Sequence, residues 1–137
     1  MDDALPRSAA FQWNAGGWFG GQLGGTLWML LAAAFLVPVD PVVAALTFAV
    51  FLVPTTLGFF LWSRRGRYRP YPCLQLLIGV TGLCALILFV LWRGMAGEHL
   101  LEAFGGQSAY VHYAWLLVFP GLMLLFHVQE QAARRAQ

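Results

Sequence analysis

The sequence predicts an all-α integral membrane protein, a four-transmembrane-helix bundle made of two helical hairpins. Of the 137 residues, 60% are hydrophobic and only 10% are charged, whereas an ordinary soluble domain has about 25% charged residues. A soluble fold of this size would lack the polar side chains that its surface needs, but a surface facing lipid needs none. The chain also contains four apolar stretches of about 20 residues, the length that crosses a hydrocarbon core of about 30 Å.

The predicted spans make up a single membrane domain, residues 1–137. In chain order they are residues 18–37, 42–62, 73–92 and 109–128. Pro38 and Pro41 interrupt the helix between the first two spans, because a proline has no backbone donor and restricts the residue before it. The first two spans therefore form a hairpin. A basic cytoplasmic loop, residues 63–72, precedes the third span, and an outer loop, residues 93–108, precedes the fourth.

The arginines orient these spans. Seven of the eight basic residues fall on one side of the predicted bundle and Arg93 falls on the other. The seven are Arg7, Arg64, Arg65, Arg67, Arg69, Arg134 and Arg135. Because cytoplasmic loops carry an excess of basic residues, we expect both termini in the cytoplasm. The compact first hairpin and the absence of lysine favour a bacterial inner membrane. The basic residues are too few and too dispersed for a nucleic-acid-binding surface.

The densest group of charges lies in the basic loop. It consists of Arg64, Arg65, Arg67 and Arg69. Each basic residue near an anionic leaflet contributes about 1 kcal/mol to membrane attachment. We therefore expect this loop to bind lipid headgroups, so membrane lipids are the first partners that the sequence predicts. The alternative is that these arginines only orient the bundle.

Glycines occupy one face of the first span in two adjacent rows. One row is Gly16, Gly20 and Gly24, and the other is Gly17, Gly21 and Gly25. Such small-residue faces let two membrane helices approach closely and associate through van der Waals contact. The face therefore predicts either packing within one subunit or a contact between subunits, in a homo-oligomer or with other membrane subunits.

Prolines lie near the middle of the second and fourth spans. Each removes an internal hydrogen bond, so we expect a kink near the bilayer midplane in both helices. A small ion or solute channel or carrier is one function that suits such kinks, and its path would be lined by Pro54, Thr55, Thr56, Gln75 and Pro120. No Asp, Glu, Lys or Arg falls inside a predicted span, which argues against a proton-coupled or cation-coupled carrier.

The two hairpins are alike in the placement of a few polar residues. Gln22 and Thr26 in the first span correspond to Gln75 and Thr81 in the third, and a span containing a proline follows each. Because the first and third spans point the same way, these elements would form a parallel tandem, a scheme that some transporters use. The alternative is a chance likeness, since glycine and proline are common in membrane helices.

Two histidines of the fourth span suggest a redox role. His112 and His127 are fifteen residues apart, about 22 Å along a helix, a distance that suits two haem groups in opposite leaflets. Each iron would need a second axial ligand, and His99 in the outer loop is the remaining histidine. We therefore expect no cofactor and treat a haem or quinone subunit as the weakest alternative.

The sequence contains no pattern typical of an enzyme or a metal site. Cys73 and Cys84 are eleven residues apart, roughly 16 Å on one helix, which exceeds the ~7 Å limit for a disulfide. Glu98 and Glu102 lie in the outer loop, where we expect them to be solvated. No catalytic or metal-binding residue is predicted. The leading hypothesis is a non-enzymatic membrane protein that works as a homo-oligomer or an accessory subunit through its glycine face.

Overall fold

The chain is mostly helical in the part that the structure describes, residues 10–103 and 113–136. In this computed structural model the long helices are α1 (Ala15–Leu36), α2 (Pro41–Ser63), α3 (Pro70–Ala103) and α5 (Val118–Arg135). No strand occurs among the described residues. The prediction of four helices is confirmed, because α1, α2, α3 and the segment Tyr113–Arg135 are long and apolar enough to cross a membrane.

Side-chain caps fix where the first two helices begin. The Asn14 side chain accepts a hydrogen bond from Gly17 N at 3.1 Å at the start of α1. At the start of α2, Asp40 Oδ1 accepts from Val42 N at 2.9 Å and from Val43 N at 3.1 Å. These oxygens satisfy amides that have no partner inside a helix. Asp40 therefore helps to specify the turn between the two helices, together with Pro38 and Pro41.

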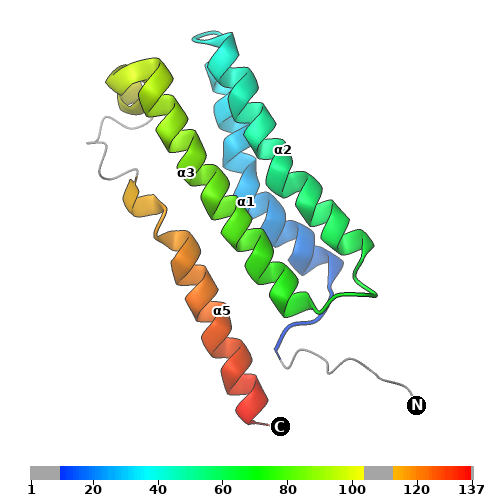
Figure 1. Ribbon diagram of the computed structural model, residues 1–137. Coiled ribbons are helices and arrows are strands. Elements are labelled where there is room, and N and C mark those ends of the chain that lie inside the picture. The colour runs from blue at the N-terminus through cyan, green and yellow to red at the C-terminus, as the bar shows by residue number, and fades with distance from the viewer. Residues whose placement is uncertain (1–9, 104–112, 137) are drawn as a thin grey trace.

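Three helices form a compact group, and the fourth lies at its edge (Figure 1). α1 packs against α2 and α3, α2 packs against α3, and α5 packs against α3 on the side away from α2. The start of α1, the α2–α3 connection and the end of α5 lie at the same end of the bundle. We call this the basic end, because it carries Arg64, Arg65, Arg67, Arg69, Arg134 and Arg135.

The buried core lies within the three-helix group and has two parts. The part farther from the basic end includes Met29, Leu36, Val43, Leu88 and Trp92. The part nearer the basic end consists of Trp18, Leu61, Cys73 and Leu77. Many large apolar side chains outside these two parts are exposed on all four helices. This distribution suits a bundle whose outer surface faces lipid instead of water.

Two side chains of α1 donate hydrogen bonds to the backbone of α2. Gln22 Nε2 donates to Thr55 O at 2.9 Å, and Trp18 Nε1 donates to Gly58 O at 3.1 Å. The Gln22 amide lies against Gly58, in the space that a Cβ at position 58 would occupy. The glycine therefore allows α1 and α2 to approach closely at this level.

The second hairpin repeats this arrangement. Gln75 Nε2 of α3 donates to Met123 O of α5 at 2.9 Å. The hydroxyl of Tyr71, which lies four residues before Gln75, is 2.9 Å from His127 Nδ1 of α5. In each hairpin, a glutamine and the aromatic residue one turn before it thus link the first helix to the second.

The structure departs from the predicted boundaries in two places. α3 has 34 residues and ends at Ala103, so the predicted outer loop begins as helix. In the fourth span, the helix breaks just before α5, where Leu116 O accepts from Phe119 N at 3.2 Å. Pro120 has no N–H to donate to that carbonyl. It lies in the first turn of α5, where proline is well tolerated, instead of in the middle of a continuous helix.

Substituting Gly58 tests the close approach of α1 and α2. Gly58→Ala places a methyl group in the space of the Gln22 amide, so we expect a loss of about 1–3 kcal/mol in the free energy of unfolding. Gly94→Ala is the matched control, because a Cβ at that position of α3 meets no described atom within 4 Å. Unfolding in mild detergent checks both variants, and equal stabilities would contradict the close approach.

Candidate functional site

A large hollow lies between α1 and α5, with α3 as its floor. Its volume is about 830 Å³, and we call it the α1–α5 groove. α3 contributes one helical face, made of Leu74, Leu77, Ile78, Thr81, Ala85 and Phe89. α5 and the turn before it contribute Trp115, Leu116, Val118, Phe119, Leu122 and Phe126. The hollow exists because α5 packs against α3 without closing onto α1.

Glycines form much of the α1 wall of the groove. Gly17, Gly21, Gly24 and Gly25 line it, whereas Gly16 and Gly20 do not. A Cβ placed at Gly21 or Gly24 would meet no described atom within 4 Å, and a Cβ at Gly25 would meet only the Thr81 methyl group, at 3.8 Å. Among the described residues, this wall is therefore largely uncovered at Gly21 and Gly24.

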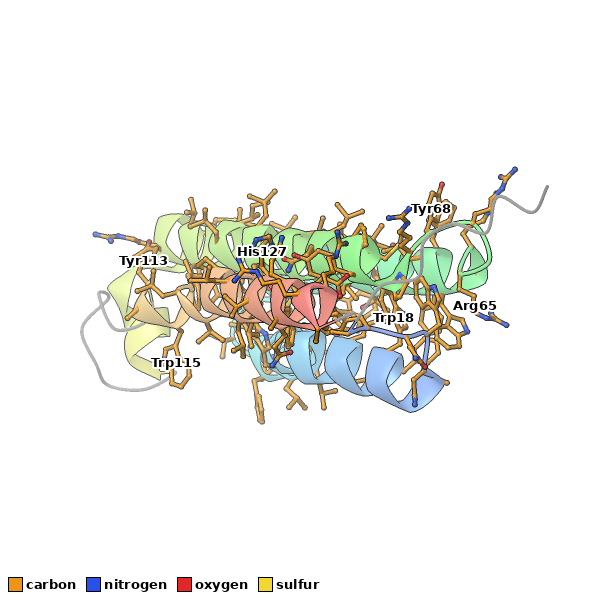
Figure 2. The ribbon with its side chains drawn as sticks, turned by 90° about the horizontal axis from the view of Figure 1, so that it is seen from below. Trp18, Arg65, Tyr68, Tyr113, Trp115 and His127 are labelled. Atoms are coloured by element: carbon orange, nitrogen blue, oxygen red, sulfur yellow. The ribbon has the colours of Figure 1, made fainter. Side chains whose placement is uncertain are left out.

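Aromatic side chains occur at both ends of the groove. Trp18 lies toward the basic end and Trp115 toward the opposite end, as Figure 2 shows. Trp115 is 67% exposed. The groove is also lined by Trp28 and Phe89, whose rings are nearly parallel, with their centroids 6.1 Å apart. Along α1 the groove thus extends from Gly17 to Trp28, about the first half of the helix.

The chemistry of the lining residues favours binding over catalysis. The described residues that line the groove include no Asp, Glu, His, Cys, Tyr, Lys or Arg. Its few polar members are the amides of Gln12, Asn14 and Gln22 and the hydroxyl of Thr81. None of these groups can transfer a proton near neutral pH without strong activation. The groove can hold an apolar ligand or helix, but its lining supplies no acid or base.

Three side chains tether α5 to α3 in the half of the bundle that carries the basic end. Gln75 Nε2 lies 3.2 Å from the Tyr71 hydroxyl as well as 2.9 Å from Met123 O. The same hydroxyl lies 2.9 Å from His127 Nδ1. Gln75 and His127 were predicted as a pathway residue and a haem ligand, respectively. The structure brings them together as parts of one hydrogen-bonded tether.

A buried carboxylate at the end of α5 was missed by the sequence analysis. Glu130 is only 1% exposed. Its Oε2 accepts from Ala10 N at 3.0 Å, and its Oε1 accepts from Arg134 Nε at 3.1 Å. It lies just beyond the predicted span, which ended at residue 128. The spacing of Glu130 and Arg134, one helical turn apart, was the signal that could have found this pair.

The predicted channel residues do not converge on the groove. Pro54, Thr55, Thr56, Gln75 and Pro120 are all described, and none of them lines it. The hydroxyls of Thr55 and Thr56 instead donate to carbonyls one turn earlier in α2, those of Phe51 and Leu52, at 2.9 and 2.7 Å. Internal backbone bonds of this kind are common for such residues in helices. The channel alternative gains no support from these positions.

The remaining candidates for cofactor or metal binding form no such site among the described residues. His112 lies outside the described residues, and His127 is exposed on α5. No group of three His, Cys, Asp or Glu side chains suitable for a metal ion occurs in the described part of the chain. Cys73 and Cys84 are buried free thiols in different parts of the core.

The four arginines of the basic loop separate into two pairs. The Arg64 guanidinium lies 5.6 Å from the ring centroid of Phe60, and that of Arg65 lies 4.9 Å from the ring centroid of Trp62. Arg67 and Arg69 instead line a second hollow between the ends of α2 and α3. The structure thus distinguishes arginines that the sequence analysis treated as one group.

No family model, curated protein or solved structure matches the chain. The function is therefore argued from the groove and the basic end themselves.

Replacing Gln75 tests the tether of α5. Gln75→Met conserves volume but removes the hydrogen bonds to Met123 O and to the Tyr71 hydroxyl. Hydrogen bonds between membrane helices average ~0.6 kcal/mol and reach ~1.7 kcal/mol, so we expect faster amide exchange in α5 by roughly threefold to twentyfold. Gln129→Met is the control, because Gln129 is exposed on α5. Unchanged exchange in Gln75→Met would show that the tether does not hold α5.

Proposed function

We propose that the protein is a multi-pass membrane protein that acts as a non-enzymatic subunit, and that its α1–α5 groove binds an apolar transmembrane helix. The observation that carries this proposal is the glycine wall of the groove, which none of the described side chains covers at Gly21 or Gly24. Helices in membranes associate through such small-residue faces, because lipid tails and apolar side chains are equally hydrophobic and only close contact favours association.

A partner helix would explain why glycine occupies positions where a larger residue would fit. Glycine in a helix interior weakens it by up to ~1 kcal/mol relative to alanine. The described structure has room for a Cβ at Gly21 and Gly24, so the fold of one subunit does not require glycine there. A helix seated against this wall does require it, because any side chain would hold the two backbones apart.

A second copy of the chain is the occupant that needs no further component. The protein would then work as a homo-oligomer, with an apolar helix of one subunit in the groove of the next. Another membrane protein that supplies such a helix would make the chain an accessory subunit. The same glycine wall serves both arrangements, and the mass of the particle distinguishes them.

The basic end gives the proposed orientation. Six of the described arginines lie there, and Arg93 lies on α3 toward the opposite end. The positive-inside rule then favours a cytoplasmic basic end, with both termini in the cytoplasm. A bacterial inner membrane is the membrane that we infer.

Thiol labelling tests this orientation. A cysteine at Gly66, in the basic loop, should react with a membrane-impermeant maleimide only in inverted vesicles, and a cysteine at Val39 should react only in right-side-out vesicles. Val39 is 68% exposed in the α1–α2 turn. The native thiols are both 5% exposed, so they should contribute little background. The opposite labelling pattern would reverse the proposed orientation.

Two adjacent glycines allow a sharp test of the groove. Gly21 lines the groove and Gly20 does not, yet a Cβ at either position meets no described atom within 4 Å. We expect Gly21→Leu to fill the groove and weaken association by about tenfold or more, which corresponds to about 1.4 kcal/mol. Gly20→Leu should leave association within about threefold of the wild type, because it adds the same side chain outside the groove. Native mass spectrometry in mild detergent measures both.

The outcomes separate the groove from the rest of the glycine face. Loss of the assembly only in Gly21→Leu supports the groove as the contact. An assembly that survives both substitutions contradicts the proposal, and equal loss in both moves the contact to the outward side of α1. A monomeric wild-type particle with no bound protein contradicts the homo-oligomer.

A further inference from the structure

A second hollow lies at the basic end, between the last turns of α2 and the first turns of α3. Its volume is about 510 Å³. Arg67, Tyr68 and Arg69 form its polar rim. Its apolar part is formed by Leu57, Phe60, Leu61, Pro72, Cys73 and Leu76. The hollow thus has two guanidinium groups at one end and an apolar trough below them, between two helices.

Arg67 and Arg69 line this hollow, whereas Arg64 and Arg65 do not. Arg64 and Arg65 lie over Phe60 and Trp62, and Arg65 Nη1 donates to Trp62 O at 3.3 Å. Figure 2 shows Arg65 and Tyr68 on opposite sides of the bundle end. Arg67 and Arg69 have no ion-pair partner among the described residues. The positive charge at the rim of the hollow is therefore available to an anionic ligand.

We propose that this hollow is a binding site for one anionic phospholipid. Arginine matches a phosphate in charge and in geometry, because its planar guanidinium donates two parallel hydrogen bonds. The lipid phosphate binds Arg67 and Arg69, with the Tyr68 hydroxyl beside it, and an acyl chain lies along Leu61 and Leu76. The proposal rests on membrane insertion with the basic end at the headgroup level and is independent of what occupies the α1–α5 groove.

The combination of the two regions distinguishes a lipid from other ligands. A soluble phosphate would use the arginines but leave the apolar trough uncovered. A neutral or zwitterionic lipid would fill the trough but leave the net positive charge of the rim unbalanced. A phospholipid with a net negative charge complements both at once, because its phosphate and its acyl chain are covalently joined.

Two double variants that remove the same positive charge from different arginines test the proposal. The delipidated wild-type protein in mild detergent is titrated with phosphatidylglycerol, and native mass spectrometry counts the bound lipids. We expect one tightly bound lipid, and Arg67→Gln with Arg69→Gln should lower its affinity at least tenfold, because hydrogen bonds to charged groups are strong. Arg64→Gln with Arg65→Gln removes the same charge from the same loop and should change the affinity by less than about threefold.

A second pair of variants tests the trough without changing charge. Leu76 is 50% exposed and lines the hollow, whereas Leu83 is 57% exposed, lies two turns later on α3 and does not line it. Leu76→Trp should weaken the lipid at least tenfold by filling the trough, and Leu83→Trp should not. Because both side chains are exposed, neither substitution disturbs the core.

Several results would overturn the proposal. Equal losses in the two arginine pairs would mean that the loop attracts the leaflet through net charge alone. Equal binding of phosphatidylglycerol and phosphatidylcholine would mean that the rim does not recognise charge. Displacement of the lipid by millimolar inorganic phosphate would identify a soluble-anion site, and normal binding to Leu76→Trp would remove the trough from the site.

Discussion

Hydrogen bonds from two glutamines to backbone carbonyls join the two helices of each hairpin. In an apolar surrounding a buried amide without a partner is costly, so each bond favours one alignment of its helix pair. Gln22 joins α1 to α2, and Gln75 joins α3 to α5. Each hairpin also has a glycine where a side chain of the other helix comes close: the Gln22 amide lies against Gly58, and Phe119 of α5 lies close to Gly82, two turns after Gln75 on α3.

α5 joins the bundle less firmly than the other three helices, and this difference creates the groove. In α1, 33% of the residues of the apolar stretch are buried, and in α2 and α3 28%, compared with 6% in the segment that contains α5. The described hydrogen bonds of α5 reach α3 and Ala10. α5 therefore stays beside α3, and the described residues leave Gly21 and Gly24 of α1 uncovered. The uncovered glycines of α1 and the low burial of α5 therefore have the same cause, which is the position of α5.

Much of the fold could be predicted from the sequence, because the length and apolarity of a span are local properties. The helices begin within a few residues of the predicted spans, apart from the fourth, where the lost donor of Pro120 breaks the helix. Whether a glycine of α1 lines the groove or faces outward depends on where α5 lies. No local sequence pattern predicts that position. Glu130 was missed for a related reason: it accepts a hydrogen bond from Ala10 N, 120 residues away in the sequence. The separation of the arginines depends on side-chain direction, which sequence spacing does not give.

The length of α3 has a consequence for the shape of the protein outside the bilayer. Its 34 residues extend about 51 Å at 1.5 Å per residue, while a hydrocarbon core is about 30 Å thick. The helix is therefore longer than such a core requires, and its last turns, up to Ala103, include the polar residues Glu98, His99 and Glu102. In a membrane of that thickness, α3 would have to tilt or to extend beyond the lipid tails.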